Sequence, residues 1–237
     1  MSGIVKKVLT YLIFPLIIIA LAYFIVQSVM EPVNFNKEKA AREQVAIQRL
    51  KDIRTLQDAF KTETGRFTAS MDTLKSFYLD STMKVVMQIG SQDDSIAVAN
   101  TERLKKRNRR ITPEQMLELY RKGEHLVFSI ENEIPVKDTL FNKRTDFCLD
   151  SLAFAPFSGG DSIKMQAAVK TVSGVKVPLF EASLTYKSLL KGMDNQLRIN
   201  LDASEKEKND KKYGTPDFSG LKVGSITAPN NNAGNWE

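Results

Sequence analysis

Cysteine and histidine are almost absent from this chain of 237 residues, each occurring once, as Cys148 and His125. A single cysteine excludes an intramolecular disulfide framework and a cysteine-rich zinc site, and a single histidine leaves few ways to build acid–base catalysis. Eight prolines and twelve glycines exclude a collagen-like or low-complexity chain. Because 42% of the residues are hydrophobic, the chain can form one domain of ordinary size or two small ones.

Motifs that carry chemistry are also missing. No glycine loop of either common nucleotide-binding pattern occurs, and Phe157–Asp161 is predicted to be a turn. His125 starts a predicted strand without a nucleophile beside it, Cys148 is predicted to be a small packed residue, and Asp93 and Asp94 lack the spacing of a calcium loop. The sequence therefore predicts a non-enzymatic protein with no catalytic, cofactor-binding or metal-binding residue.

One long hydrophobic run stands out, Val8 to Val29, with no ionisable side chain except tyrosine. As a helix its 22 residues reach roughly 33 Å, against a hydrocarbon core of about 30 Å. A cleaved signal peptide is the alternative, since Lys6, Lys7 and the small residues Ala20 and Ala22 imitate its parts. Apolar residues continue to Val29, which favours an uncleaved signal-anchor. The residues predicted to anchor the chain are Leu12, Ile17, Ile18, Leu21, Phe24 and Ile25.

Charges beside this run bear on its orientation. Lys6 and Lys7 favour a cytoplasmic amino terminus, whereas the basic residues that follow the run within about twenty positions oppose it. Glu31 stands directly at the C-terminal boundary, and long domains translocate largely regardless of charge. We therefore expect a single-pass protein of the cytoplasmic (inner) membrane whose C-terminal domain lies in the periplasm.

A second helix is predicted after a break at Glu31-Pro32, because proline disfavours helix in its predecessor. Asn36 is its predicted cap, and Lys37–Thr62 contains neither glycine nor proline. One face of this helix is apolar and is predicted to pack on the chain's own sheet. A dimeric coiled coil is the alternative. The apolar face comprises Val45, Ala46, Leu50, Ile53, Leu56, Ala59 and Phe60, and its candidate partner-helix residues are Leu50, Ile53, Leu56 and Phe60.

The end of this helix, Ile53–Phe67, followed by Met71–Leu74, resembles the corresponding region of type IV pilins and type II secretion pseudopilins. In that family an apolar helix leads through a turn of glycine, a basic or polar residue and an aromatic into a segment with a small, acidic, x, leucine pattern. The resemblance covers about residues 40–78 and implies a plan of anchor, helix and sheet that an accessory or assembly protein can share. Physically, Gly65 would supply a left-handed cap and Phe67 would fold back over the helix end.

The net charge of +6 is concentrated in residues 31–123, where 18 basic side chains outnumber 13 acidic ones. Six of the basic groups fall within eight positions: Arg103, Lys105, Lys106, Arg107, Arg109 and Arg110. We predict a solvated loop, with an anionic-surface patch for lipid or an acidic partner as the functional alternative. Nucleic acid is not expected as a partner, because aromatic residues are not interleaved and no binding motif is present.

Short segments of the remaining chain give further predictions. A helix opens at Thr112 with a capping box, and the alternation of Ile163–Val169 with the return to Tyr186 predicts a hairpin with a bulge near Pro178. The other predicted strands are Lys84–Gly90 paired with Ser95–Asn100, His125–Glu131, Thr139–Asn142, Phe147–Phe157, Gln196–Leu201 and Leu221–Ile226. Residues 203–213 are predicted to be a charged loop, and Pro229–Glu237 an irregular tail.

Together these segments define an α+β protein with an N-terminal transmembrane helix, a long amphipathic helix and an antiparallel β-rich domain. The predicted divisions are a tail at 1–7, the membrane helix at 8–29, a helix-rich region at 30–123, the β-rich domain at 124–202 and a linker with tail at 203–237. We expect the protein to act as a structural or assembly component of a cell-envelope complex, with the lipid bilayer, other envelope proteins or copies of itself as partners and no cofactor. The alternative is an anchored module that recognises a lipid or small ligand through its β domain.

Overall fold

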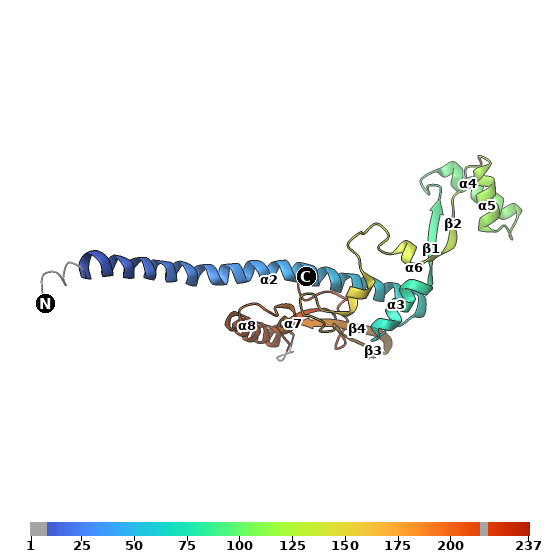
Figure 1. Ribbon diagram of the computed structural model, residues 1–237. Coiled ribbons are helices and arrows are strands. Elements are labelled where there is room, and N and C mark those ends of the chain that lie inside the picture. The colour runs from blue at the N-terminus through green and yellow to red at the C-terminus, as the bar shows by residue number, and fades with distance from the viewer. Residues whose placement is uncertain (1–8, 214–217) are drawn as a thin grey trace. The chain divides into compact units, whose positions relative to one another are not determined.

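The computed structural model describes residues 9–213 and 218–237 and has the predicted α+β class (Figure 1). Lys6, Lys7 and the predicted tail at 1–7 lie outside the described residues. The helices are the π-helical turn η1 (Leu9–Ile13), α2 (Phe14–Thr64), α3 (Met71–Asp80), α4 (Ser95–Arg107), α5 (Pro113–Arg121), α6 (Val136–Thr139), the 3-10 helix η2 (Leu149–Ala153), α7 (Tyr186–Leu189) and α8 (Asn195–Tyr213). The strands are β1 (Thr82–Ile89), β2 (Phe128–Pro135), β3 (Lys164–Val172), β4 (Val175–Thr185) and β5 (Gly220–Gly224).

Helix α2 runs without interruption through Pro32, so the predicted break at Glu31-Pro32 and the predicted cap at Asn36 are wrong. An interior proline costs about 3 kcal/mol, but ending the helix there would require a second nucleation and a second set of caps. Strong apolar and amphipathic helical segments on either side of Pro32 outweigh this local cost. The apolar segment and the predicted second helix are therefore one continuous helix.

The chain forms two compact units, and α2 contributes to both. Unit 1 comprises Met1–Thr55, Phe67–Ser70 and Cys148–Glu237, and unit 2 comprises Leu56–Arg66 and Met71–Phe147. In unit 1 an antiparallel sheet has the order β3-β4-β5. The predicted hairpin is confirmed as β3 and β4, but the bulge is wrong, because the register is continuous from Lys164 opposite Ser183 to Val172 opposite Val175. Pro178 is tolerated because β5 pairs with β4 only from Glu181 onward.

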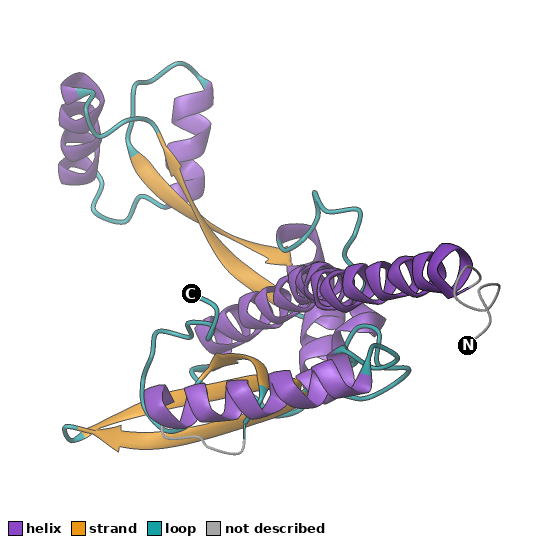
Figure 2. Cartoon of the chain, turned by 90° about the vertical axis from the view of Figure 1, so that its left-hand side faces the viewer, coloured by secondary structure: helices purple, strands orange, loops and turns teal. Residues whose placement is uncertain are grey.

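The core of unit 1 lies between α2 and this sheet, which run alongside each other in Figures 1 and 2. Leu50 and Ile53 are completely buried on α2, and Phe180 of β4 packs against Phe67 with ring centroids 4.8 Å apart. Packing of the apolar face on the chain's own sheet is thus confirmed at these positions. Val45, predicted on the same face, is 43% exposed.

The C-terminal part of unit 1 corrects two predictions. The predicted strand Gln196–Leu201 and the predicted loop at 203–213 form one helix, α8. The carboxylate of Asp194 accepts a hydrogen bond from the Leu197 amide at 2.7 Å and so caps the helix, which ion pairs four residues apart then stabilise. The predicted final strand is confirmed as β5, and the tail is ordered: Gly234 bridges to Val223 and Arg54 pairs with Glu237 at 2.9 Å.

Unit 2 is built on a ribbon of β1 and β2, antiparallel from Thr82 opposite Pro135 to Ile89 opposite Phe128. The ribbon has α3 and α6 at one end and α4 and α5 at the other (Figure 1). The predicted hairpin of Lys84–Gly90 with Ser95–Asn100 is therefore wrong, because Asp94 caps a helix at that point. The predicted strands Thr139–Asn142 and Phe147–Phe157 are also wrong. Helix α6 ends at Thr139, and turns, η2 and one isolated bridge from Phe154 to Ser162 are found in the rest. The helix opening at Thr112 and the strand from the region of His125 are confirmed as α5 and β2.

Candidate functional site: membrane anchor and basic head

The amino-terminal part of α2 has the length and composition of one membrane-spanning helix, and its apolar window is entirely unburied in the folded chain. A signal sequence has the same length and composition. All six predicted anchor residues are exposed: Leu12, Ile17, Ile18, Leu21, Phe24 and Ile25. Soluble monomers rarely expose so long a contiguous apolar surface, which is typical of membrane or protein contact sites. The backbone of a helix is hydrogen-bonded internally, which suits it to a bilayer.

The exposed segment continues without a break into the packed part of unit 1. Phe35 is only 8% exposed, five positions after Met30, so the folded domain covers α2 almost from the end of the apolar run. About two turns further on, the Tyr186 hydroxyl donates to a carboxylate oxygen of Glu43 at 2.5 Å, and Lys39 lies 3.3 Å from the same oxygen. Burial, and then the hydrogen bond to Glu43, raises the pKa of Tyr186 well above its ordinary value. These contacts hold α2 against α7.

At the end of the ribbon in unit 2, α4, α5 and their connections (residues 90–127) form a small separate lobe, which we call the basic head. Its core is Met116 and Leu126 with Phe128 of the ribbon, flanked by partly buried Leu104 and Ile111. The two helices are well capped: Asp94 accepts from two amides of α4, and Thr112 and Gln115 form the predicted capping box of α5. The head therefore presents its surface from a defined helical pair.

The six predicted cationic residues gather on this head, but in a different local structure from that expected. Arg103, Lys105, Lys106 and Arg107 belong to α4, so the predicted loop is wrong for them, whereas Arg109 and Arg110 follow the helix. All six side chains are exposed, and within the described part of the chain none of them makes an ion pair. Basic groups in the last turn stabilise a helix through its dipole, although like charges four residues apart oppose one another. The result is a concentrated cationic surface without intramolecular neutralisation.

A shallow depression of about 410 Å³ adjoins this surface and is lined by Asn100, Arg103, Arg107 and the loop Gly123–His125, among others. His125 is highly exposed, with Nδ1 3.9 Å from a carboxylate oxygen of Asp94. Within residues 9–213 and 218–237, no three His, Cys, Asp or Glu side chains converge as a metal site would require. The depression can hold an anionic group by charge.

The structure also differs from the sequence predictions at Cys148 and at the predicted partner-helix face of α2. Cys148 is exposed, so its predicted packed role is wrong, and hydrogen bonds from Ser151 lower the pKa of its thiol. The four candidate partner-helix residues, Leu50, Ile53, Leu56 and Phe60, are all buried within the folded chain and do not form an open docking face.

The structure also brings together a group that sequence analysis missed. Lys187, Lys191 and Arg198 line one depression at the junction of α7 and α8. The sequence does contain a signal for α8: Asp194 is a residue type favoured at helix caps, and the run that begins at Asn195 contains neither glycine nor proline up to Tyr213. The short apolar alternation within that run favours a strand and hides this signal.

No family model matches the chain, and no curated protein or solved structure is significantly similar to it. What the structure defines is a class of architecture: a long, apolar N-terminal helix continued by helices and two small antiparallel sheets.

Gly90 is predicted to be essential for the attachment of the basic head to the ribbon. Its φ is +78°, and a Cβ atom there would lie 2.3 Å from the carbonyl oxygen of Leu126. We expect Gly90→Ala to destabilise the head by about 1–3 kcal/mol, because it adds backbone strain and a clash with main-chain atoms. Hydrogen exchange in α4 and α5 should accelerate. Gly123→Ala is the matched control: φ is +98° but nothing lies within 4 Å, so exchange at the ribbon end should change less. Equal effects of the two variants would contradict the role of the close approach.

Proposed function

We propose that this is a single-pass, non-enzymatic membrane protein whose exported α+β domain works by contact in a cell-envelope assembly such as a secretion or pilus-like complex. The observation that carries the proposal is the unburied apolar helix, which continues directly into the folded domain. An uninterrupted helical connection of this kind suits a component that holds a domain at a defined position beside a membrane.

The local features shared with pilins and pseudopilins support an assembly role. Gly65 has φ +75° and its amide donates to the Lys61 carbonyl at 2.8 Å, as a left-handed cap does. Phe67 is buried, and so are Leu74 and Phe77 of α3. Members of the family that this region resembles use a carboxylate in the apolar helix to pair with a neighbouring subunit's amine. Residues 8–30 of this chain contain no carboxylate. We therefore propose an accessory or assembly component rather than a filament subunit.

The basic head is our candidate for the partner surface, in place of the buried face of α2. Its unpaired cations contrast with cations of unit 1 such as Lys39, Arg42 and Lys206, each of which pairs with a carboxylate four positions away. Charge complementarity would give an acidic protein surface rapid and salt-sensitive association with the head. A second candidate function, lipid recognition by the anchored domain, is favoured by the cationic depression between α7 and α8.

Thiol labelling of intact cells should test the proposed topology directly, because Cys148 is the chain's one cysteine and is exposed. We expect a membrane-impermeant maleimide to modify Cys148 once it can reach the periplasm, before the inner membrane is opened. Its lowered thiol pKa favours the reactive thiolate. Cys148→Ser is the control and should show no labelling. Modification only after the inner membrane is permeabilised would place the domain in the cytoplasm and overturn the proposed export.

A further inference from the structure

A cationic depression lies at the α7–α8 corner, by which we mean Tyr186–Arg198. It encloses about 590 Å³ of open space, and its lining includes three cationic side chains, Lys187, Lys191 and Arg198, with Asp161 as the acidic member. Ser188, Gly192, Met193 and Asn195 complete the lining. An open, polar depression of this kind suits a small anionic group better than an apolar ligand.

The corner is held firmly to α2. Arg42 donates from Nη1 to the carbonyl oxygens of Leu189 and Lys191, at 3.2 and 3.0 Å, and Leu189 itself is completely buried. On the other side, the Lys191 ammonium donates to the Ser158 carbonyl oxygen at 2.8 Å. These contacts fix the main chain that carries the cations, so little ordering would be needed when an anion binds.

Acidic groups near the depression are largely committed to other contacts. Asp194 caps α8 through the Leu197 amide, and Asp202 pairs with Lys206 at 3.2 Å. Arg198 donates to the amide oxygen of Asn195 at 2.7 Å through one nitrogen, which leaves further N–H groups of its guanidinium. Three cations against Asp161 make the lining net positive.

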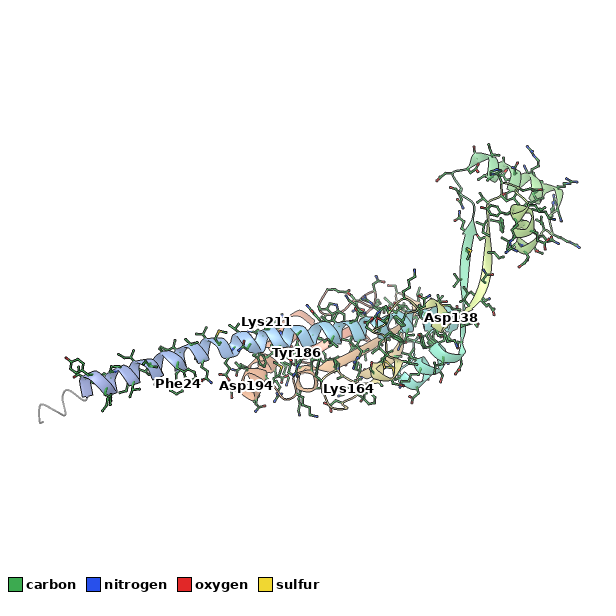
Figure 3. All side chains as sticks on the ribbon, turned by 45° about the horizontal axis from the view of Figure 1, so that its top comes forward. Phe24, Asp138, Lys164, Tyr186, Asp194 and Lys211 are labelled. Atoms are coloured by element: carbon green, nitrogen blue, oxygen red, sulfur yellow. The ribbon has the colours of Figure 1, made fainter. Side chains whose placement is uncertain are left out.

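The corner lies at the end of unit 1 nearest the apolar segment of α2. Phe35 is covered by the domain only about 7.5 Å along the helix from Met30, and Arg42 follows about 18 Å from Met30. The headgroup layer beyond the hydrocarbon is itself roughly 5–7 Å thick on each side. Figure 3 places Asp194 at the end of unit 1 that faces Phe24 and the membrane segment, and α8 lies at the same end in Figure 1. Long basic side chains can extend from this end toward the bilayer.

We propose that the α7–α8 corner binds the phosphate of an anionic phospholipid headgroup through Lys187, Lys191 and Arg198. This rests on the membrane anchoring proposed for α2, but not on which side of the membrane the domain occupies. Binding would hold unit 1 against the bilayer surface and limit its tilt about the membrane helix.

The test uses the full chain, with Cys148→Ser and Gln196→Cys carrying an environment-sensitive fluorophore beside the depression. The protein is reconstituted into vesicles of phosphatidylcholine, alone or with about a quarter phosphatidylglycerol, and quenching by headgroup-attached nitroxide lipid is measured. We expect strong quenching with phosphatidylglycerol and weak quenching without it. The triple variant Lys187→Gln, Lys191→Gln, Arg198→Gln should shift the docked population by roughly a hundredfold, given the worth of one basic residue near an anionic surface.

The matched control removes the same charge from the β3–β4 hairpin, by Lys164→Gln, Lys170→Gln and Lys176→Gln, and should preserve the quenching. These side chains are exposed, and Figure 3 places Lys164 farther from Phe24 than Asp194. Lys187→Arg with Lys191→Arg should also preserve it, which separates charge from folding. Flotation of the vesicles tests anchoring independently: a chain that fails to float overturns the anchor itself. A chain that floats but is quenched equally with and without phosphatidylglycerol overturns the lipid site alone. Loss of quenching with millimolar inorganic phosphate at constant ionic strength would show a site for free phosphate and overturn the lipid assignment.

Discussion

Two aspartates in the apolar segment, Ile17→Asp with Leu21→Asp, should release the protein from the membrane. Both side chains are exposed on α2 and face no protein group that could pair with a carboxylate in the described structure. A charged residue at the centre of a spanning helix costs about 3 kcal/mol on insertion scales, and each substitution also removes a favourable apolar side chain. We expect the double variant to move from the carbonate-resistant membrane fraction to the soluble or aggregated fraction.

Equivalent substitutions at exposed apolar positions outside this segment provide the control. Ile96→Asp with Val169→Asp changes residues that are 67% and 61% exposed, and it should leave membrane fractionation unchanged. The intact mass of the wild-type chain separates an anchor from a cleaved signal peptide, because cleavage after Ala22 would remove residues 1–22 and with them most of the apolar segment. Retention of the double aspartate variant in carbonate-washed membranes would contradict anchoring by α2.

The long exposed apolar helix could be predicted from the sequence because an apolar run needs no tertiary information to be recognised. The fate of Pro32 could not, since it depends on the balance between one lost hydrogen bond and the cooperativity of a helix 51 residues long. Local rules describe the cost at a single residue, whereas the structure responds to the whole segment. The left-handed turn at Gly65 was predictable for the opposite reason, because its geometry is set by adjacent residues.

The strands illustrate the opposite case. β3 and β4 are joined by a two-residue turn at Ser173 and Gly174, and their alternation predicted the pair correctly. β1 instead pairs with β2, and the 38 residues between them form the basic head. The prediction paired β1 with the next apolar segment in the sequence, which is helical. In α8, the alternation of Leu197, Ile199 and Leu201 imitates a strand over a short window, and only the longer pattern of opposite charges four residues apart identifies a helix.

The candidate sites divide in the same way. The basic cluster was evident because six cations are consecutive or nearly so in the sequence, although its helical geometry was not. The α7–α8 corner depends on Arg42 reaching carbonyl groups 147 and 149 positions away, and on a side-chain contact from Lys191 to Ser158. No local pattern encodes such contacts, because the fold alone brings these residues together.

Leu50→Ala should be among the most destabilising single substitutions in α2, by about 2–5 kcal/mol, because it opens a cavity beneath a completely buried side chain. Val45→Ala is the matched control, since Val45 is largely exposed on the same helix and its loss should cost less than about 1 kcal/mol. Chemical unfolding of the full chain in detergent, followed by near-ultraviolet circular dichroism, measures both.

The dependence of unfolding on protein concentration distinguishes packing of Leu50 within its own chain from packing in a coiled coil between two chains. If Leu50 packs within its own chain, the free energy of unfolding of wild type and variant should be independent of protein concentration. If the same face formed a coiled coil between two chains, the unfolding midpoint would rise with concentration and Leu50→Ala would abolish that rise. A small effect of Leu50→Ala, equal to that of Val45→Ala, would contradict the packing of α2 against β4. Because α2 carries both the exposed apolar segment and this core, the expected loss would also loosen the Arg42 and Glu43 contacts that hold the α7–α8 corner against α2.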